Sequence, residues 1–175
     1  NGLRVQIADT SWDKTAKSKL EGLPTYLGNP ISEHADRHLD LIGIGRMLAL
    51  SPHESVNLSA ALHYRQELGK NNIYVLQTKP SDKTSPTKRV AADRRGDTLF
   101  GAEVTYDTLT AALTAGASIK STKLSESFGF SELLATHGQG IIPLFAIDPR
   151  ERIRVFTAEK KVIPEAGWLV ISLVP

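Results

Sequence analysis

The chain has 175 residues, is 41% hydrophobic and carries a formal net charge of +2. This hydrophobic content excludes a disordered chain, and the length allows one domain, or one domain with a small module. Because cysteine is absent, a disulfide scaffold, a cysteine nucleophile and a thiolate metal site are excluded. No stretch reaches the roughly 20 apolar residues of a membrane span, so we expect the chain as given to be soluble.

Apolar runs alternate with helical patterns through the first part of the chain. The runs are short and end at turn-forming residues, as is typical of buried strands. Strands that alternate with helices favour a parallel sheet. The sequence therefore predicts an α/β fold here, with strands within 4–8, 23–30, 46–51 and 72–77 and helices within 11–21, 32–41 and 52–68.

The stretch "SPHE" is the clearest local signal in this part. Ser51 is expected at the N-cap of the third helix, Pro52 at its first helical position, and Glu54 as the capping-box partner. Gly69 is then expected to end the helix.

The composition changes after Thr78. Residues 79–97 are polar and basic and contain no aromatic side chain, which favours a linker or loop over a surface that stacks nucleic-acid bases. Beyond it we expect a strand at 99–104 and a helix at 106–116 capped by Asp107.

The end of the chain is rich in β-type sequence. Residues 118–124 are expected to form a strand or a loop, and three apolar runs from about residue 140 predict a small β module. The predicted organisation is a partial Rossmann-like nucleotide-binding domain (3–78), a basic linker (79–97) and a C-terminal α+β module (98–175) with its β-rich end at about 140–175.

Polar and small side chains follow the ends of the first three predicted strands. Asp9 ends the first strand, where a carboxylate can accept hydrogen bonds from ribose hydroxyls, and Thr10 follows it. Asn29 offers an amide to a base or a ribose. Leu50 and Ser51 would line the bottom of the same crevice at the ends of the strands. These five residues form the candidate cofactor site. The alternative at each position is plain turn or cap chemistry.

Other motifs assign no catalytic residue and no metal ligand. His34 and His38 lie one helical turn apart, as in some zinc sites, but no third ligand is obvious, which favours a solvated or partner-contacting helix face. There is no G-x-S-x-G motif and no phosphate-binding glycine loop of the G-x-x-x-x-G-K type.

Three stretches, "VQIADTSWD", "LPTYLGNPISEHADRHLDLIGIGRMLALSPHESVN" and "YRQELG", resemble the cytosolic tail of bacterial monovalent cation:proton (Na⁺/H⁺) antiporters. That tail carries a Trk-type NAD-binding (regulator of K⁺ conductance-like) Rossmann domain after the transmembrane part. The final stretch "IPEAGWLVISLVP" is similar to the small C-terminal module of such proteins.

The resemblance implies a non-catalytic, nucleotide-sensing regulatory domain that modulates Na⁺ or K⁺/H⁺ exchange. In such domains the acid that ends the second strand binds the adenosine ribose, which would be Asp9, and Asn29 and Leu50 would wall the adenine. The first strand, glycine loop and first helix have no counterpart here. We therefore expect a fragment cut inside the Rossmann unit, which binds NAD or an adenine nucleotide weakly or not at all although the parent protein binds one.

The resemblance also implies where the chain works and with what. The expected partners are the transmembrane antiporter domain of the same polypeptide and a second copy, in a homodimer or larger, with no nucleic acid. The expected location is the cytoplasmic side of the bacterial inner membrane. The alternatives are a soluble NAD(P)-dependent oxidoreductase fragment, with His63, Tyr64 and Tyr106 as candidate acids or bases, and a ligand-free assembly domain.

Overall fold

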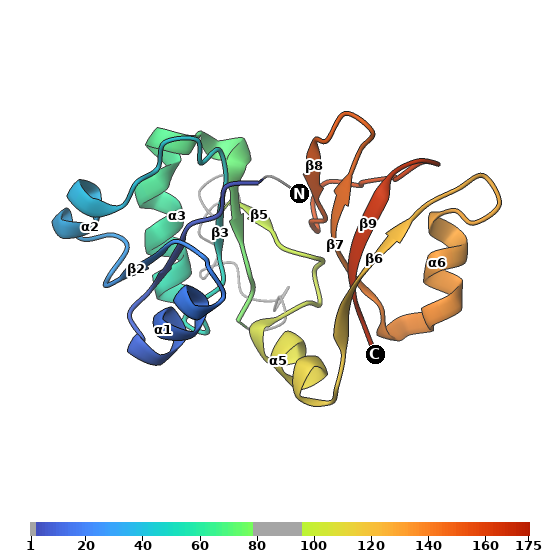
Figure 1. Cartoon of the computed structure of the whole chain (residues 1–175), viewed down its shortest axis with the longest axis horizontal. Coiled ribbons are helices and arrows are strands. Elements are labelled where there is room, and N and C mark those ends of the chain that lie inside the picture. The colour runs from blue at the N-terminus through green and yellow to red at the C-terminus, as the bar shows by residue number, and fades with distance from the viewer. Residues whose placement is uncertain (1–2, 79–95) are drawn as a thin grey trace, which may run out of the picture.

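The computed structural model describes residues 3–78 and 96–175 (Figure 1). The fold has two halves, and the first of them includes a short strand from the beginning of the second range. In the first half, short parallel strands alternate with helices. In the second half, a four-stranded antiparallel sheet packs against a helix. The predicted α/β class, with parallel strands first and a β-rich module last, is confirmed. Most of the predicted basic linker, residues 79–95, lies outside the described residues.

The first half contains two parallel sheets and three helices. One sheet pairs β1 (Ile7–Asp9) with β2 (Thr25–Leu27), and the other has the order β3 (Met47–Ala49), β4 (Ile73–Val75), β5 (Asp97–Thr98). The helices are α1 (Trp12–Leu20), α2 (Glu33–His38) and α3 (Glu54–Leu68), and a 3-10 turn, η1 (Lys70–Asn72), precedes β4.

Among the described residues, strand β1 is paired on one side, with β2. The Ile7 N–H donates to Pro24, and the Asp9 carbonyl accepts from Gly28, so both residues direct their backbone groups towards β2. Backbone groups alternate in direction along a strand. The N–H and C=O of Ala8 therefore point away from β2.

Strand β3 has the same one-sided pairing in the second parallel sheet. The Ala49 carbonyl accepts from the Leu76 N–H, so the backbone groups of Leu48 point away from β4. Within the described residues, the parallel strands are thus interrupted between β1 and β3.

The approaches to these two strands lie beside each other. The Arg4 guanidinium donates to the Ile42 carbonyl at 2.6 Å and to Asp40 Oδ2 at 2.5 Å. Arg4 precedes β1, and Asp40 and Ile42 precede β3. The side chain of Arg4 therefore links the segment before β1 to the segment before β3, the two strands that each have an unpaired side in the described residues.

The antiparallel sheet has the strand order β6-β9-β7-β8. Its strands are β6 (Ser118–Lys123), β7 (Ile142–Ile147), β8 (Ile153–Val155) and β9 (Leu169–Val174). Helix α5 (Tyr106–Thr114) precedes it, and α6 (Phe130–His137) with the 3-10 turn η3 (Gly138–Gly140) lies between β6 and β7. Leu133 of α6 packs on Val170 and Val174 of β9, which covers one face of the sheet.

The sheet β3-β4-β5 is covered on both faces. On one face Ile73 packs against Ala61 and Tyr64 of α3. On the other face Tyr74 belongs to a cluster with Val155 of β8. The antiparallel sheet therefore takes the place of a second helix layer.

The turn from β7 to β8 is held by a buried carboxylate. Asp148 accepts hydrogen bonds from the N–H groups of Arg150 and Arg152 and from the Arg152 guanidinium at 2.7 Å. Burial acts to raise the pKa of Asp148, but these donors outweigh it and lower the pKa. The charged Asp148 therefore fixes the hairpin.

Two predicted element boundaries are wrong. The first strand covers Ile7–Asp9 rather than 4–8, because Arg4 turns to the segment before β3. The strand predicted at 99–104 is instead β5 at Asp97–Thr98; Phe100 then takes φ +65°, a conformation that ends an extended strand.

Two predicted helix caps are also wrong. His53, not Ser51, is the N-cap of α3, because Ser51 Oγ accepts from the His53 N–H in a local turn. Thr105, not Asp107, caps α5 through a reciprocal capping box with Thr108. The helix α6 was not predicted, and the residues at 118–124 that were expected as strand or loop form β6.

Candidate functional site

Asp9 is the last residue of β1 and its carboxylate is already engaged locally. Oδ1 accepts from the Ser11 N–H at 2.8 Å, and Oδ2 lies 3.7 Å from Lys14 Nζ. The side chain keeps 31% of its surface exposed. The turn alternative is therefore realised at Oδ1, while Oδ2 pairs with Lys14 and the side chain as a whole stays partly exposed.

Asn29 lies just beyond β2, at the same end of the two-stranded sheet as Asp9. The Gly28 N–H donates to the Asp9 carbonyl at 3.0 Å, which joins the two strand ends. Asn29 Oδ1 accepts from the Ile31 N–H at 3.2 Å in the turn before α2. Thr10 is exposed beside Asp9. Three of the five predicted site residues thus share one strand end.

Leu50 and Ser51 lie at the carboxyl end of β3, in the other parallel sheet. Leu50 is 47% exposed. The buried side chain of Asn57 accepts from the Ser51 N–H and donates to the carbonyls of Ser51 and Leu76, at 2.8, 2.8 and 3.2 Å. Asn57 therefore fixes the crossover from β3 to α3 and the end of β4.

The sequence did not single out Asn57, although an asparagine in the apolar stripe of a helix was a usable signal.

The five predicted residues fall into two groups, Asp9, Thr10 and Asn29 on one sheet and Leu50 and Ser51 on the other. The interruption between β1 and β3 separates the two groups, and no hydrogen bond joins them in the described part of the chain.

Of the three residues considered as acids or bases of an oxidoreductase, Tyr106 begins α5 and packs against the cluster around Leu99. The other two, His63 and Tyr64, join α3 to α2 and to the turn before it. His63 Nε2 lies 2.9 Å from Asp36 Oδ1, and the Tyr64 hydroxyl donates to the Pro30 carbonyl. Burial, with smaller contributions from Asp36 and Glu67, raises the pKa of Tyr64 to about 12. Tyr64 therefore stays a neutral hydrogen-bond donor at physiological pH.

His34 and His38 form a stacked pair on the exposed face of α2. Their ring centroids lie 4.0 Å apart, His34 Nδ1 bonds the Tyr26 hydroxyl, and His38 Nδ1 donates to the His34 carbonyl. Across residues 3–78 and 96–175, no three His, Asp or Glu side chains gather closely enough to hold a metal ion.

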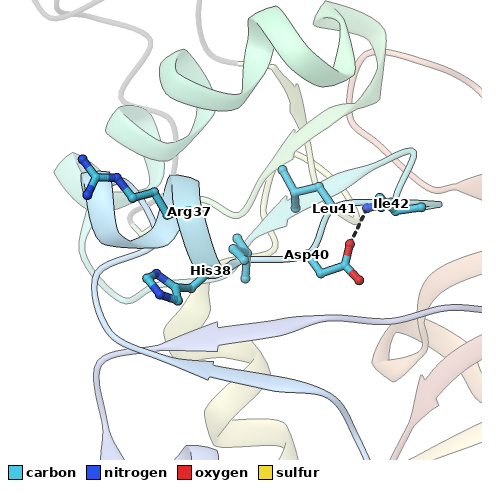
Figure 2. A pocket seen from close by; sticks show the side chains of 6 residues that line it. Arg37, His38, Asp40, Leu41 and Ile42 are labelled. Carbon is cyan, nitrogen blue, oxygen red and sulfur yellow. Dashed lines mark hydrogen bonds between the residues drawn. The ribbon is translucent and has the colours of Figure 1, made fainter.

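A shallow hollow of about 500 Å³ lies on the segment between α2 and β3 (Figure 2). All six lining residues come from the continuous stretch 37–42, and none belongs to the predicted site. Asp40, which lines it, is bonded to the Ile42 N–H and to Arg4, and these bonds lower its pKa. The hollow is a surface feature of this loop, separate from the strand ends.

None of the helices in the described ranges combines the length and apolar character that crossing a bilayer requires.

Comparison with known proteins gives only distant likenesses, all of them to solved structures. No protein-family model matches the chain, and no characterised protein matches it by sequence. Among solved structures, it is similar to one described as "Crystal Structure of the GsuK RCK domain", with 12% identity and a TM-score of 0.33. The match covers 97% of this chain and 43% of that chain, so this chain spans less than half of that structure's length.

Proposed function

We propose that this chain is a regulatory, non-catalytic domain that senses NAD or an adenine nucleotide and modulates cation:proton exchange by a membrane transporter of which it is part. The observation that carries the proposal is the interruption of the parallel strands between β1 and β3. Asp9 lies at the carboxyl end of one of the two strands that border it.

One additional parallel strand would complete this arrangement. It would pair with the outward backbone groups of Ala8 on one side and of Leu48 on the other. The strand order would then be β2-β1-new-β3-β4-β5, the order of a dinucleotide-binding sheet with its central strand in place. In such sheets the ligand lies at the carboxyl ends of the strands, where the order reverses direction.

The inserted strand would also supply what the described residues lack for binding. Nucleotide phosphates are held by backbone N–H groups of a glycine loop and by a helix N-terminus, and that element follows the central strand in this fold. Asp9 Oδ2 would accept from the ribose, with Asn29 and Leu50 beside the adenine. We assign the chain no chemical step, because sensing needs only a ligand with different affinities for two states of the domain.

The transporter context rests on the sequence resemblance to cation:proton antiporter tails. It is tested by the sequence of the parent protein upstream of Asn1. Several apolar spans of roughly 20 residues are expected there, followed by a strand and a glycine-rich turn. A soluble catalytic domain at that place would contradict the antiporter assignment.

The nucleotide proposal is tested by calorimetry on the full-length parent protein with NAD and with AMP. We expect binding without consumption of NAD, and we expect Asp9→Ala to weaken it at least about tenfold, since a charge-assisted hydrogen bond to ribose is lost. Asp13→Ala, which removes a nearby acid from the first turn of α1, is the matched control and should leave affinity unchanged.

Residues 1–175 alone should bind weakly or not at all, because no G-x-G-x-x-G loop that leads from a parallel strand into a helix occurs in residues 3–78 and 96–175. Two results would contradict the proposal: micromolar NAD binding by residues 1–175 alone, or full-length binding that Asp9→Ala leaves intact.

A further inference from the structure

Helix α1 buries small residues and exposes its large apolar ones, which is the reverse of an ordinary surface helix. Thr15 is 2% exposed, Ala16 and Ser18 are half-buried, and the helix packs on β1 and β2 through these small residues. Trp12 and Leu20, its two large apolar residues, are 68% and 90% exposed. A helix that covers a sheet normally turns its large apolar residues inward, so the outward face of α1 needs a separate explanation.

The exposed residues form one stripe. Trp12 and Leu20 lie eight residues apart, about two helical turns, which brings them to one side of the helix. Lys17 lies three residues before Leu20 and Lys19 lies seven residues after Trp12, so both lysines flank these two residues. The α1 surface thus combines an apolar stripe with cationic margins.

The charge of α1 is predominantly positive. It carries Lys14, Lys17 and Lys19 against the single acid Asp13. Lys14 approaches Asp9, whereas within the described residues no carboxylate forms an ion pair with Lys17 or Lys19. Figure 1 shows α1 at the periphery of the molecule, on the side away from α6.

We infer that the outer face of α1 docks on an anionic membrane surface. Tryptophan is favoured at the boundary between headgroups and acyl chains, and a helix with one apolar face and lysines at its margins lies in the plane of that boundary. Trp12 and Leu20 enter the boundary region, and Lys17 and Lys19 contact the lipid phosphates. The basic margins select anionic over zwitterionic lipid.

A membrane surface fits this face better than a second copy of the chain does. A stable protein interface buries about 800 Å² on each partner, whereas α1 offers two large apolar side chains on nine residues. Two copies meeting through α1 would also bring their lysines together. A lipid surface carries the complementary negative charge.

Such docking is weak and reversible, because a single short apolar face anchors a protein only marginally. It rests on α1 alone and does not depend on the proposed nucleotide site, so either proposal can fail without the other.

The test uses residues 1–175 and unilamellar vesicles of phosphatidylcholine, with or without phosphatidylglycerol. The chain has two tryptophans, so Trp168→Phe leaves Trp12 as the only reporter. We expect co-sedimentation and a blue shift of Trp12 emission with the anionic vesicles only, both weakened by salt. Trp12→Ala combined with Leu20→Ser should reduce binding at least about tenfold, and Lys17→Glu with Lys19→Glu should abolish the preference for anionic lipid.

The matched control changes an equally exposed apolar residue elsewhere. Ile163 is 62% exposed in the connection between β8 and β9, and Ile163→Ser should leave vesicle binding unchanged. Two results would overturn the inference. They are absence of binding to the anionic vesicles, and a Trp12 shift that follows protein concentration and so assigns the face to a second copy.

Discussion

The two margins of the sheet β3-β4-β5 differ in how they are finished. At β5, residues from the connection after β8 close the edge. The Ala158 N–H donates to the Thr98 carbonyl, the Glu159 carboxylate accepts from the N–H and hydroxyl of Thr98 at 2.7 and 2.6 Å, and Lys160 bonds Asp97 at 2.6 Å. At β3, no strand or loop segment within the described residues pairs with the side that faces away from β4.

Burial follows the same division. Leu99, directly after β5 at the closed margin, is 0% exposed, whereas Val5 and Leu50, beside the open one, are 48% and 47% exposed. Natural edge strands usually carry lysine, proline or a bulge that prevents further pairing, but β1 (Ile-Ala-Asp) and β3 (Met-Leu-Ala) have the composition of central strands. Within the described residues, the open margin therefore lacks the features by which natural edge strands prevent further pairing.

The largest expected effect is a difference in unfolding free energy between matched substitutions at the two margins. Leu99→Ala should cost about 3 kcal/mol of unfolding free energy, since it empties a fully buried site that joins the two halves. Leu50→Ala, the same substitution at the open margin, should cost less than about 1 kcal/mol. Urea unfolding of both variants measures the difference, and equal costs would show that the open margin is buried in solution.

The next effect concerns self-association, which unpaired strands with exposed apolar residues favour. We predict that residues 1–175 form a homodimer or larger through the open margin. Ala8→Pro removes the N–H that points away from β2, so it should raise the dissociation constant at least about tenfold, or about 1.4 kcal/mol, with little loss of stability.

Light scattering across a wide concentration range measures this association. Ile7→Pro is the control, because it removes the N–H that bonds Pro24 and should instead destabilise the fold. A wild-type chain that stays monomeric throughout would contradict the prediction.

The sequence predicted the order of elements in the first half because each signal there is local. Ser11 caps α1 and Ser32 caps α2 within three residues, and Gly69 ends α3 with φ +78°. The same local reasoning placed the three final strands. Such signals need no knowledge of which segments meet.

The errors arose where a competing contact decides the structure. The sequence placed Ser51 at a helix cap, but Ser51 Oγ accepts from the His53 N–H in a local turn and Asn57 takes the Ser51 backbone groups. It extended the first strand to residue 4, but Arg4 bonds Ile42. For the candidate site, it placed Asp9 and Asn29 at one strand end, and it could not show that Leu50 and Ser51 lie across an interruption.

The smallest expected effect tests the closed margin through one ion pair. The hydrogen bond to Asp97 raises the pKa of Lys160, outweighing the opposing effect of burial. A lysine whose pKa is higher in the folded state contributes stability that is fully present below its unfolded pKa, near 10.4, and is lost as the pH rises through the folded value. Since the Lys160 side chain is 53% exposed, solvent screening limits the contribution to about 0.5 kcal/mol.

Lys160→Met should therefore lower the unfolding free energy at pH 7 by about this amount, and the difference from wild type should shrink as the pH rises above the unfolded pKa of about 10.4. Lys161→Met, at the neighbouring exposed position, controls for loss of charge and should show no such pH dependence. If both variants behave alike, the edge of β5 is held by Glu159 and the backbone bonds rather than by Lys160. The contrast between the closed margin at β5 and the open margin at β3 would then rest on the Glu159 and backbone hydrogen bonds alone.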